Sequence, residues 1–256
     1  MQPVAPWVGG KRNLAARIVE VIGRTPHTLY AEPFVGMGGV FFRRPTRARV
    51  EVINDLNQDV ASFFRILREH LVPFRELVRY QLTTRADFER LCITDPATLT
   101  DLQRAARFLY LQRTGFGGKV VGRSFGVSPD RPARFDVTTL MPMLEDLHGR
   151  LASVTIECLP YAEFIARYDR PATLFYCDPP YFGSEGYYGK ALFGRADFER
   201  LVEALATLQG RFILSINDRT ETRQLFRRFK VTKVKTTYSV SKLKAKAVGE
   251  LIVTGP

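Results

Sequence analysis

The tetrapeptide Asp178-Pro179-Pro180-Tyr181 follows an apolar run, residues 173–177, whose pattern predicts a buried strand. A proline fixes its own φ at about −65° and holds the preceding residue extended. The Asp178 carboxylate and the Pro179 carbonyl are therefore presented in fixed directions as two acceptors, which suits a planar donor such as an exocyclic NH₂ group. Tyr181 can stack on the attached ring. The alternative is a strand-end aspartate before an ordinary proline turn.

A glycine turn, Val35-Gly36-Met37-Gly38-Gly39, follows an earlier predicted strand over residues 28–34. Glycines let the backbone turn sharply and approach a ligand. Asp55 closes the next predicted strand, 19 residues after Gly36, close to the roughly 20-residue spacing at which an acid meets ribose hydroxyls. Gly10-Lys11 is followed by Arg12, so no phosphate loop is present, and a nucleoside ligand without phosphates is favoured. A plain strand–helix connection remains the alternative.

Strands and helices alternate around these motifs, which predicts a Rossmann-like, doubly wound α/β sheet, mostly parallel with an antiparallel final strand. The expected helices include residues 14–22, 60–71 and 198–205. Further strands are expected over residues 50–54, 154–157 and 212–216, followed by a closing antiparallel pair over 230–238 and 248–253. In a parallel sheet the carboxyl ends of the strands meet at one edge, so the glycine turn, Asp55 and Asp178 should lie together there.

Residues 61–150 are mostly helical in pattern, and residues 102–113 form the clearest stretch. We therefore expect one α/β domain from residues 1–60 and 151–256, with 61–150 as an insertion. The insertion is basic, because residues 101–135 hold seven Lys and Arg against two acids. The whole chain of 256 residues has 38 Lys and Arg against 26 Asp and Glu, a formal charge of +12. A polyanionic partner such as nucleic acid explains this surplus, and an arginine-rich composition is the alternative.

The remaining composition excludes several classes of protein. The three cysteines and three histidines are scattered, so no metal site is expected and a reduced, cytoplasmic location fits best. No apolar run approaches the roughly 20 residues of a membrane helix, so no membrane partner is expected. The N-terminus has neither the basic start nor the apolar stretch of a secretory signal.

Four motifs in this order resemble the Dam-like (D12 class) DNA adenine-N6 methyltransferases, which use S-adenosylmethionine, over nearly the whole chain. The motifs are Pro6-Trp7-Val8-Gly9-Gly10-Lys11, Glu32-Pro33-Phe34-Val35-Gly36-Met37-Gly38, Asn54-Asp55-Leu56-Asn57 and Cys177-Asp178-Pro179-Pro180-Tyr181. The resemblance implies catalysis by the last motif, with Asp178, Pro179, Pro180 and Tyr181. It implies cofactor contacts by Trp7, Gly10, Lys11, Glu32, Phe34, Gly36, Gly38, Asp55, Tyr161 and Asp178.

The resemblance also implies duplex DNA as partner, an adenine flipped out of the helix, and residues 61–150 as a target-recognition domain. The DNA-contact candidates are Arg113, Lys119, Arg123, Lys242 and Lys244, each of which could instead be a solvated charge or touch only phosphate. Gly117 stands where relatives often carry Asn, so no target sequence is transferred. Residues 182–193 are expected either to cover the site or to be a solvated linker, and the chain to be a monomer or weak dimer.

Two other functional classes remain open at this point. One is methylation of another amine, on cytosine N4, RNA adenine or a protein glutamine, although such families more often carry Ser or Asn at the position of Asp178. The other is a basic DNA-binding protein that keeps only a residual nucleotide fold. The intact Asp178, glycine turn and Asp55 argue against such decay.

Overall fold

The computed structural model describes residues 1–127, 130, 132–184, 186, 193–239 and 245–256. Within them one sheet of seven strands has the order β3-β2-β1-β4-β5-β7-β6. The strands are β1 (Leu29–Glu32), β2 (Val50–Asn54), β3 (Val154–Glu157), β4 (Thr173–Cys177), β5 (Arg211–Asn217), β6 (Lys230–Ser239) and β7 (Ala245–Gly255). Strands β3, β2, β1, β4 and β5 pair in parallel, and β7 pairs antiparallel with both β5 and β6. The predicted doubly wound sheet with antiparallel final strands is confirmed.

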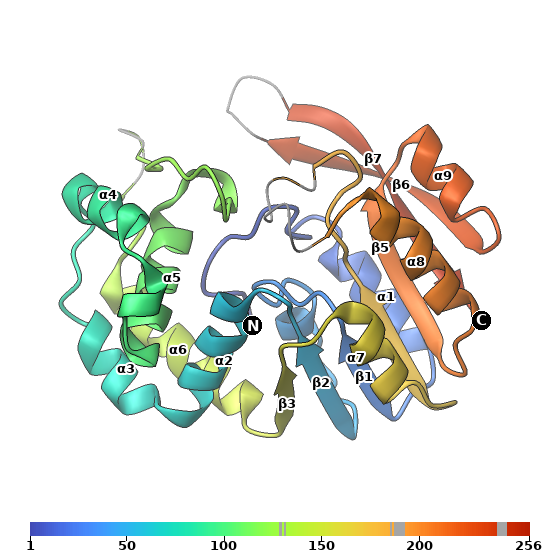
Figure 1. The fold of residues 1–256 in the computed structure, drawn as a ribbon, viewed down its shortest axis with the longest axis horizontal. Coiled ribbons are helices and arrows are strands. Elements are labelled where there is room, and N and C mark those ends of the chain that lie inside the picture. Colours follow the sequence, from blue (N-terminus) through green and yellow to red (C-terminus); the bar gives the residue numbers. More distant parts are fainter. Residues whose placement is uncertain (128–129, 131, 185, 187–192, 240–244) are drawn as a thin grey trace.

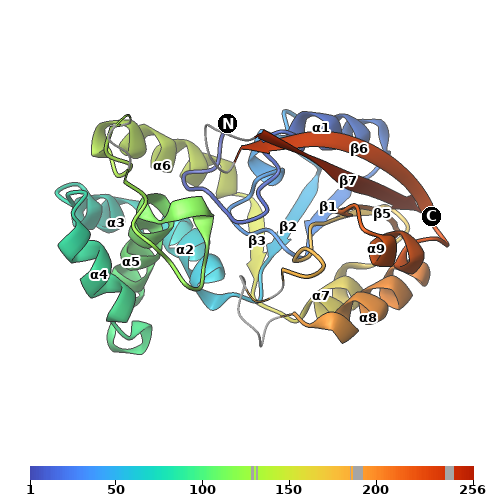
Figure 2. The same ribbon diagram turned by 90° about the horizontal axis from the view of Figure 1, so that it is seen from above.

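Helices cover both faces of this sheet (Figures 1 and 2). Helix α1 (Ala15–Arg24) lies on one face, and α7 (Tyr161–Tyr168) and α8 (Arg195–Ala206) lie on the other. Side chains alternate accordingly along each strand: Tyr30 packs into the core on the first face, and the next residue, Ala31, packs into the core on the second. The short helix α9 (Thr220–Leu225) follows β5.

Five further helices gather beyond β3 (Figure 1). They are α2 (Gln58–Glu69), α3 (Leu71–Val78), α4 (Arg85–Ile93), α5 (Asp101–Thr114) and α6 (Val137–Leu151), with 3₁₀ turns at Pro96–Thr98 and Phe116–Gly118. A further 3₁₀ turn, Phe41–Arg43, lies in the connection between β1 and β2. Helix α2 begins at Gln58, where Asn57 accepts a hydrogen bond from the Asp59 amide and caps the helix. The predicted boundary at residue 60 thus falls inside α2, and the division into two domains stays a prediction.

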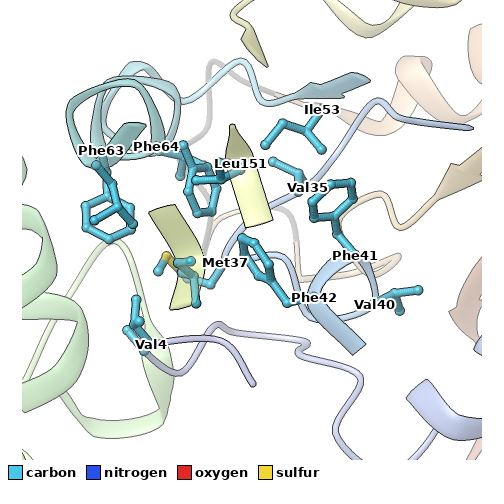
Figure 3. Packing of buried hydrophobic residues seen from close by; sticks show 14 of the residues in the cluster. Val4, Val35, Met37, Val40, Phe41, Phe42, Ile53, Phe63, Phe64 and Leu151 are labelled. Carbon is cyan, nitrogen blue, oxygen red and sulfur yellow. The ribbon is translucent and has the colours of Figure 1, made fainter. Parts of the chain in front are cut away.

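The apolar core runs without interruption from the sheet into these helices. Phe63 and Phe64 of α2 belong to the same buried cluster as Met37 of the glycine turn and Leu151 of α6, as Figure 3 shows. Phe42, which follows the glycine turn, packs against α2: the ring centres of Phe42 and Phe64 lie 5.7 Å apart. The glycine turn is therefore supported from below by residues of the helical region as well as by the sheet.

Candidate active site

A pocket opens at the carboxyl edge of the parallel strands. Residues that follow β1, β2, β3 and β4 line it together with Trp7, Tyr161 and Phe193; the full lining is Trp7, Pro33, Phe34, Gly36, Asp55, Leu56, Asn57, Leu159, Tyr161, Asp178, Pro180 and Phe193. Six of the predicted cofactor residues meet here, namely Trp7, Phe34, Gly36, Asp55, Tyr161 and Asp178.

Gly36 has a φ of +50°, and a Cβ at this position would lie 2.5 Å from Nε1 of Trp7. Glycine is therefore required both for the left-handed backbone and for the close approach of the indole ring. The Gly36 amide donates to Oδ2 of Asp55 at 2.8 Å, and the Asn57 amide donates to Oδ1 at 2.9 Å. Burial raises the pKa of Asp55 to about 6, although both amides oppose the shift.

Three aromatic rings form another wall of this pocket, which we call the cofactor pocket. The ring centres of Phe34 and Tyr161 lie 5.5 Å apart, and Phe193 lies 5.7 Å from each of them. The Tyr161 hydroxyl donates to the Asp197 carbonyl at 3.1 Å, which fixes the ring from α8. Flat apolar surfaces of this kind suit a purine ring.

Asp178 directly follows β4. Its carboxylate forms an ion pair with Lys11, with Nζ of Lys11 2.6 Å from Oδ1 of Asp178. The side chain of Lys11 is 1% exposed and that of Asp178 is 21% exposed. Lys11 also donates to the Gly9 carbonyl at 3.0 Å and to the Tyr181 hydroxyl at 2.9 Å, and Ser215 donates to Asp178 Oδ1 at 3.1 Å. Burial raises the pKa of Asp178 to about 6, and Lys11 opposes this rise. Asp178 is thus held as a carboxylate at neutral pH.

A second pocket adjoins the first and shares Trp7, Phe34 and Asp178 with it. Gly10 and Lys11 also line this second pocket, together with four arginines: Arg12, Arg43, Arg113 and Arg134. Asp178 therefore lies where a pocket with aromatic walls meets a pocket lined by arginines.

Glu32 and Gly38 line neither pocket. Glu32 is 1% exposed below the site, where the Tyr30 hydroxyl donates to its Oε1 at 2.6 Å and burial raises its pKa to about 8. Gly38 has a φ of +70°, and a Cβ there would come within 2.3 Å of the Phe42 ring. Their contacts are with the core, and their role toward a cofactor stays a prediction.

Arg113 and Arg123 of the insertion are mostly engaged within the protein. Arg113 donates to the carbonyls of Val4 and Arg134, the latter at 3.1 Å, and burial lowers its pKa. Arg123 donates to the Lys119 carbonyl at 3.2 Å, and burial lowers its pKa too. Contact of Arg113, Lys119 and Arg123 with DNA stays a prediction.

Other predicted features fall partly or wholly outside the described residues. Lys242 and Lys244 lie outside them, and so do residues 185 and 187–192 of the expected cover. Phe193, at the end of that segment, is described and lines the cofactor pocket. Within the described ranges, no group of His, Cys, Asp and Glu could hold a metal, and no helix is long and apolar enough to cross a membrane.

The N-terminal segment, residues 4–10, joins the insertion to the site. Gln112 of α5 donates to the Pro6 carbonyl at 2.8 Å, and the Val8 amide donates to the Gly118 carbonyl at 3.0 Å. A Cβ at Gly118 would lie 2.8 Å from the backbone of Trp7. The same segment places Trp7 against Gly36 and continues to Lys11, so it contacts both the helices beyond β3 and the carboxyl edge of the sheet.

The strand order, the glycine turn, the buried strand-end acid and the aromatic wall define a Rossmann-like protein with an aromatic-walled pocket beside a carboxylate. The model of the D12 class N6 adenine-specific DNA methyltransferases matches residues 7–240. The chain therefore belongs to this methyltransferase family.

Curated relatives agree with this family. The chain is 28% identical to the DNA adenine methylase of Escherichia coli (strain K12), with 92% of this chain and 87% of that protein covered. It is 27% identical to the DNA adenine methylase of Vibrio cholerae, with 92% and 88% covered. A solved structure of a putative RNA methyltransferase from Pyrococcus horikoshii is 9% identical with a TM-score of 0.43, covering 94% and 82%, too weak a likeness to inform substrate.

Sequence reasoning missed several residues of the site. Phe193, Leu159 and Asn57 line the cofactor pocket, and Ser215 and Glu250 contact the Asp178 and Tyr181 side chains. A polar residue inside an otherwise apolar strand was the available signal for the last two, since Ser215 lies in residues 212–216 and Glu250 in residues 248–253.

Proposed function

We propose that this protein transfers the methyl group of S-adenosylmethionine to the N6 amine of an adenine that is flipped out of duplex DNA. The observation that carries the proposal is the position of Asp178. It is a carboxylate held by Lys11 at the junction of the cofactor pocket and the arginine-lined pocket, and it is followed by two prolines. Membership of an adenine-specific family supports the choice of adenine.

The lining of the cofactor pocket fits S-adenosylmethionine. The Asp55 carboxylate is an acceptor for ribose hydroxyls, since each oxygen receives one backbone amide and keeps a further lone pair. Phe34, Tyr161 and Phe193 provide apolar surface for the adenine of the cofactor. When bound, S-adenosylmethionine supplies an electrophilic methyl group on its sulfonium.

Asp178 and the Pro179 carbonyl act on the amine of the target base. The N6 lone pair is delocalised into the purine ring, so this amine is a poor nucleophile. Two acceptors that bind its N–H hydrogens favour a pyramidal nitrogen and stabilise the positive charge that develops on it during attack. Because Asp178 is fixed by Lys11 and Ser215, the acceptor needs no reorganisation.

A paired adenine cannot reach a carboxylate recessed at the edge of the sheet, so the base leaves the helix, at a cost of a few kcal/mol. Tyr181 provides a ring for stacking the extruded base. Arg12, an exposed arginine of the second pocket, provides positive charge for the DNA backbone beside it. Binding that depends on such contacts weakens steeply with salt.

The test is transfer of labelled methyl from S-adenosylmethionine to unmethylated duplex DNA, with the product identified as N6-methyladenine by nucleoside analysis. We expect D178N to lower kcat by roughly 10²- to 10³-fold, because the amide cannot supply the anionic acceptor. Asparagine keeps the size of the side chain and leaves the buried Lys11 a polar partner. Wild-type turnover by D178N, or N4-methylcytosine as the product, would refute the proposal.

A further inference from the structure

Strands β5 and β7 place polar side chains next to the carboxyl end of β4. The pairing of Cys177 with Leu214 brings Ser215 of β5 beside Asp178, and the antiparallel pairing puts Glu250 of β7 opposite Asn217. Ser215 and Glu250 are 0% exposed. Neither belongs to the motifs at the sheet edge, yet Ser215 contacts Asp178 and Glu250 contacts Tyr181.

Ser215 is the last member of a directed chain of hydroxyl groups. The Ser215 and Tyr176 hydroxyls lie 2.7 Å apart, and Ser215 donates to Oδ1 of Asp178 at 3.1 Å. A serine hydroxyl has a single proton, so when it is given to Asp178 the Tyr176 hydroxyl must be the donor to Ser215. This order fixes the direction in which Ser215 acts on the carboxylate.

Glu250 acts on Asp178 through two other side chains. Lys11 can only donate, so the Tyr181 hydroxyl accepts from Lys11 and gives its own proton to Oε1 of Glu250. The Lys11 ammonium also lies 4.3 Å from the centre of the Tyr181 ring. Glu250 thereby orients Tyr181, which in turn orients the ammonium that pairs with Asp178.

We propose that Ser215 and Glu250 are positioning residues for the methyl-transfer step. Ser215 binds Oδ1 of Asp178 directly, and Glu250, through Tyr181, orients the Lys11 ammonium that pairs with the same oxygen, so that the other oxygen of Asp178 is turned toward the substrate amine. This inference rests on the proposed function. It adds two residues on the antiparallel side of the sheet to the four motifs that define the site.

The charged and titratable groups that face Asp178 come from three strands, from the residues after β4 and from Lys11 before α1. They are Lys11, Glu32 of β1, Tyr176 and Cys177 of β4, Tyr181 after β4, and Glu250 of β7. Among them the Glu250 charge raises the pKa of Asp178, whereas the hydrogen bond from Ser215 lowers it. The two positioning residues thus shift the pKa of Asp178 in opposite directions.

The experiment compares S215A and E250Q with wild type. We expect kcat to fall about tenfold in each variant, with KM for DNA and for S-adenosylmethionine within about twofold, because the acceptor is misplaced and the substrates still bind. The acidic limb of the kcat profile should move to higher pH in S215A and to lower pH in E250Q. The same opposite shifts should appear in the ¹³C carboxyl titration of Asp178 in the ligand-free protein, with the signal assigned from its absence in D178N.

E51Q is the matched control for E250Q. Glu51 is also a buried strand glutamate, but it pairs with Arg44 at 2.7 Å and Arg150 at 2.5 Å, away from Asp178. We expect E51Q to lower stability and to leave the Asp178 titration unchanged. If D178N is inactive while S215A and E250Q keep the wild-type kcat and the wild-type titration, the positioning role is refuted and the proposed function stands. If D178N is active, the proposed function itself fails.

Discussion

The carboxyl edge of the sheet and the inserted helices use their charged residues in different ways. At the edge, Asp55 and Asp178 line the cofactor pocket, and their carboxylates are held by backbone amides or by Lys11. In the insertion, Arg107 donates to the Leu91 carbonyl at 2.7 Å and Arg104 pairs with Asp59 at 2.5 Å, so charges that look free in the sequence are engaged internally. A charged residue at a strand end therefore predicts a site better than a charged residue in a helical insertion.

The difference has a simple physical origin. Residues that follow parallel strands are brought to one edge by the ladder of the sheet, so their proximity follows from the strand pattern alone. Arginine side chains are long and reach carbonyls at helix ends and in loops that are distant in sequence. Arg113, for example, contacts Val4 and Arg134. Three experiments test this contrast.

The largest effect is expected for Glu32, which lies at the edge but beneath the pocket. Its folded pKa of about 8 exceeds the ordinary value of 4.5, so the folded state retains a proton that the unfolded chain releases. The stability that this proton confers is complete below about pH 4.5 and is lost as the pH rises through 8. Between pH 5 and pH 8, wild type should lose up to about 4 kcal/mol of unfolding free energy that E32Q does not lose.

Denaturant unfolding of both proteins at several pH values measures this difference directly. Cofactor affinity of E32Q, measured in parallel, should match wild type. If E32Q instead loses cofactor affinity and shows the wild-type pH dependence of stability, Glu32 acts in cofactor binding. Its position beneath the pocket would then not distinguish a residue that stabilises the fold from one that binds the cofactor.

An intermediate effect is expected for D55N. Loss of the anionic acceptor should weaken S-adenosylmethionine binding by about 10- to 100-fold, while DNA binding stays unchanged. Because the pKa of Asp55 is raised to about 6, wild-type cofactor affinity should decline as the pH falls below 6, and D55N should lack that decline. Calorimetric titration across this pH range checks both statements. Equal affinity of the two proteins at pH 7.5 would remove Asp55 from the binding site.

The smallest effect is expected for R113A. Loss of the guanidinium leaves the Val4 and Arg134 carbonyls without this donor, which should lower the unfolding free energy by about 1–2 kcal/mol. The salt dependence of DNA binding should keep its wild-type slope. R85A is the control: Arg85 is exposed in the same helical region, pairs with Glu89 at 4.0 Å and lies 5.1 Å from the Phe125 ring centre, and such exposed contacts are weak, so its removal should change stability by less than about 0.5 kcal/mol. A shallower salt slope in R113A would show that this arginine binds phosphate.

The strand pattern predicted the sheet and its carboxyl edge closely. Residues 50–54, 154–157 and 173–177 form strands with the expected bounds. The first strand ends at Glu32, before the expected Phe34, because Pro33 has no N–H for the ladder. The resemblance gives Lys11 only as a cofactor contact, and its pairing with Asp178, 167 positions along the chain, follows only from the folded path of the first eleven residues.

Ser215 and Glu250 could not be predicted as partners of Asp178 and Tyr181, because these contacts also depend on the folded path of the chain. Their strands were predicted, but which face they present and which strands they join depend on the crossover that puts β7 between β5 and β6. Side-chain partners across a sheet require the strand order and the register, and neither is contained in local periodicity.

The N-terminal segment has a consequence for modular exchange among relatives. Because residues 4–10 bond to Gln112 and Gly118 of the insertion while Trp7 rests on Gly36, the inserted helices and the chain's first residues form a matched pair. A chimera that exchanges the predicted insertion for that of a relative should therefore take the relative's first ten residues with it. Without them, the new helices would meet a foreign segment, and the packing of Trp7 against Gly36 would be disturbed.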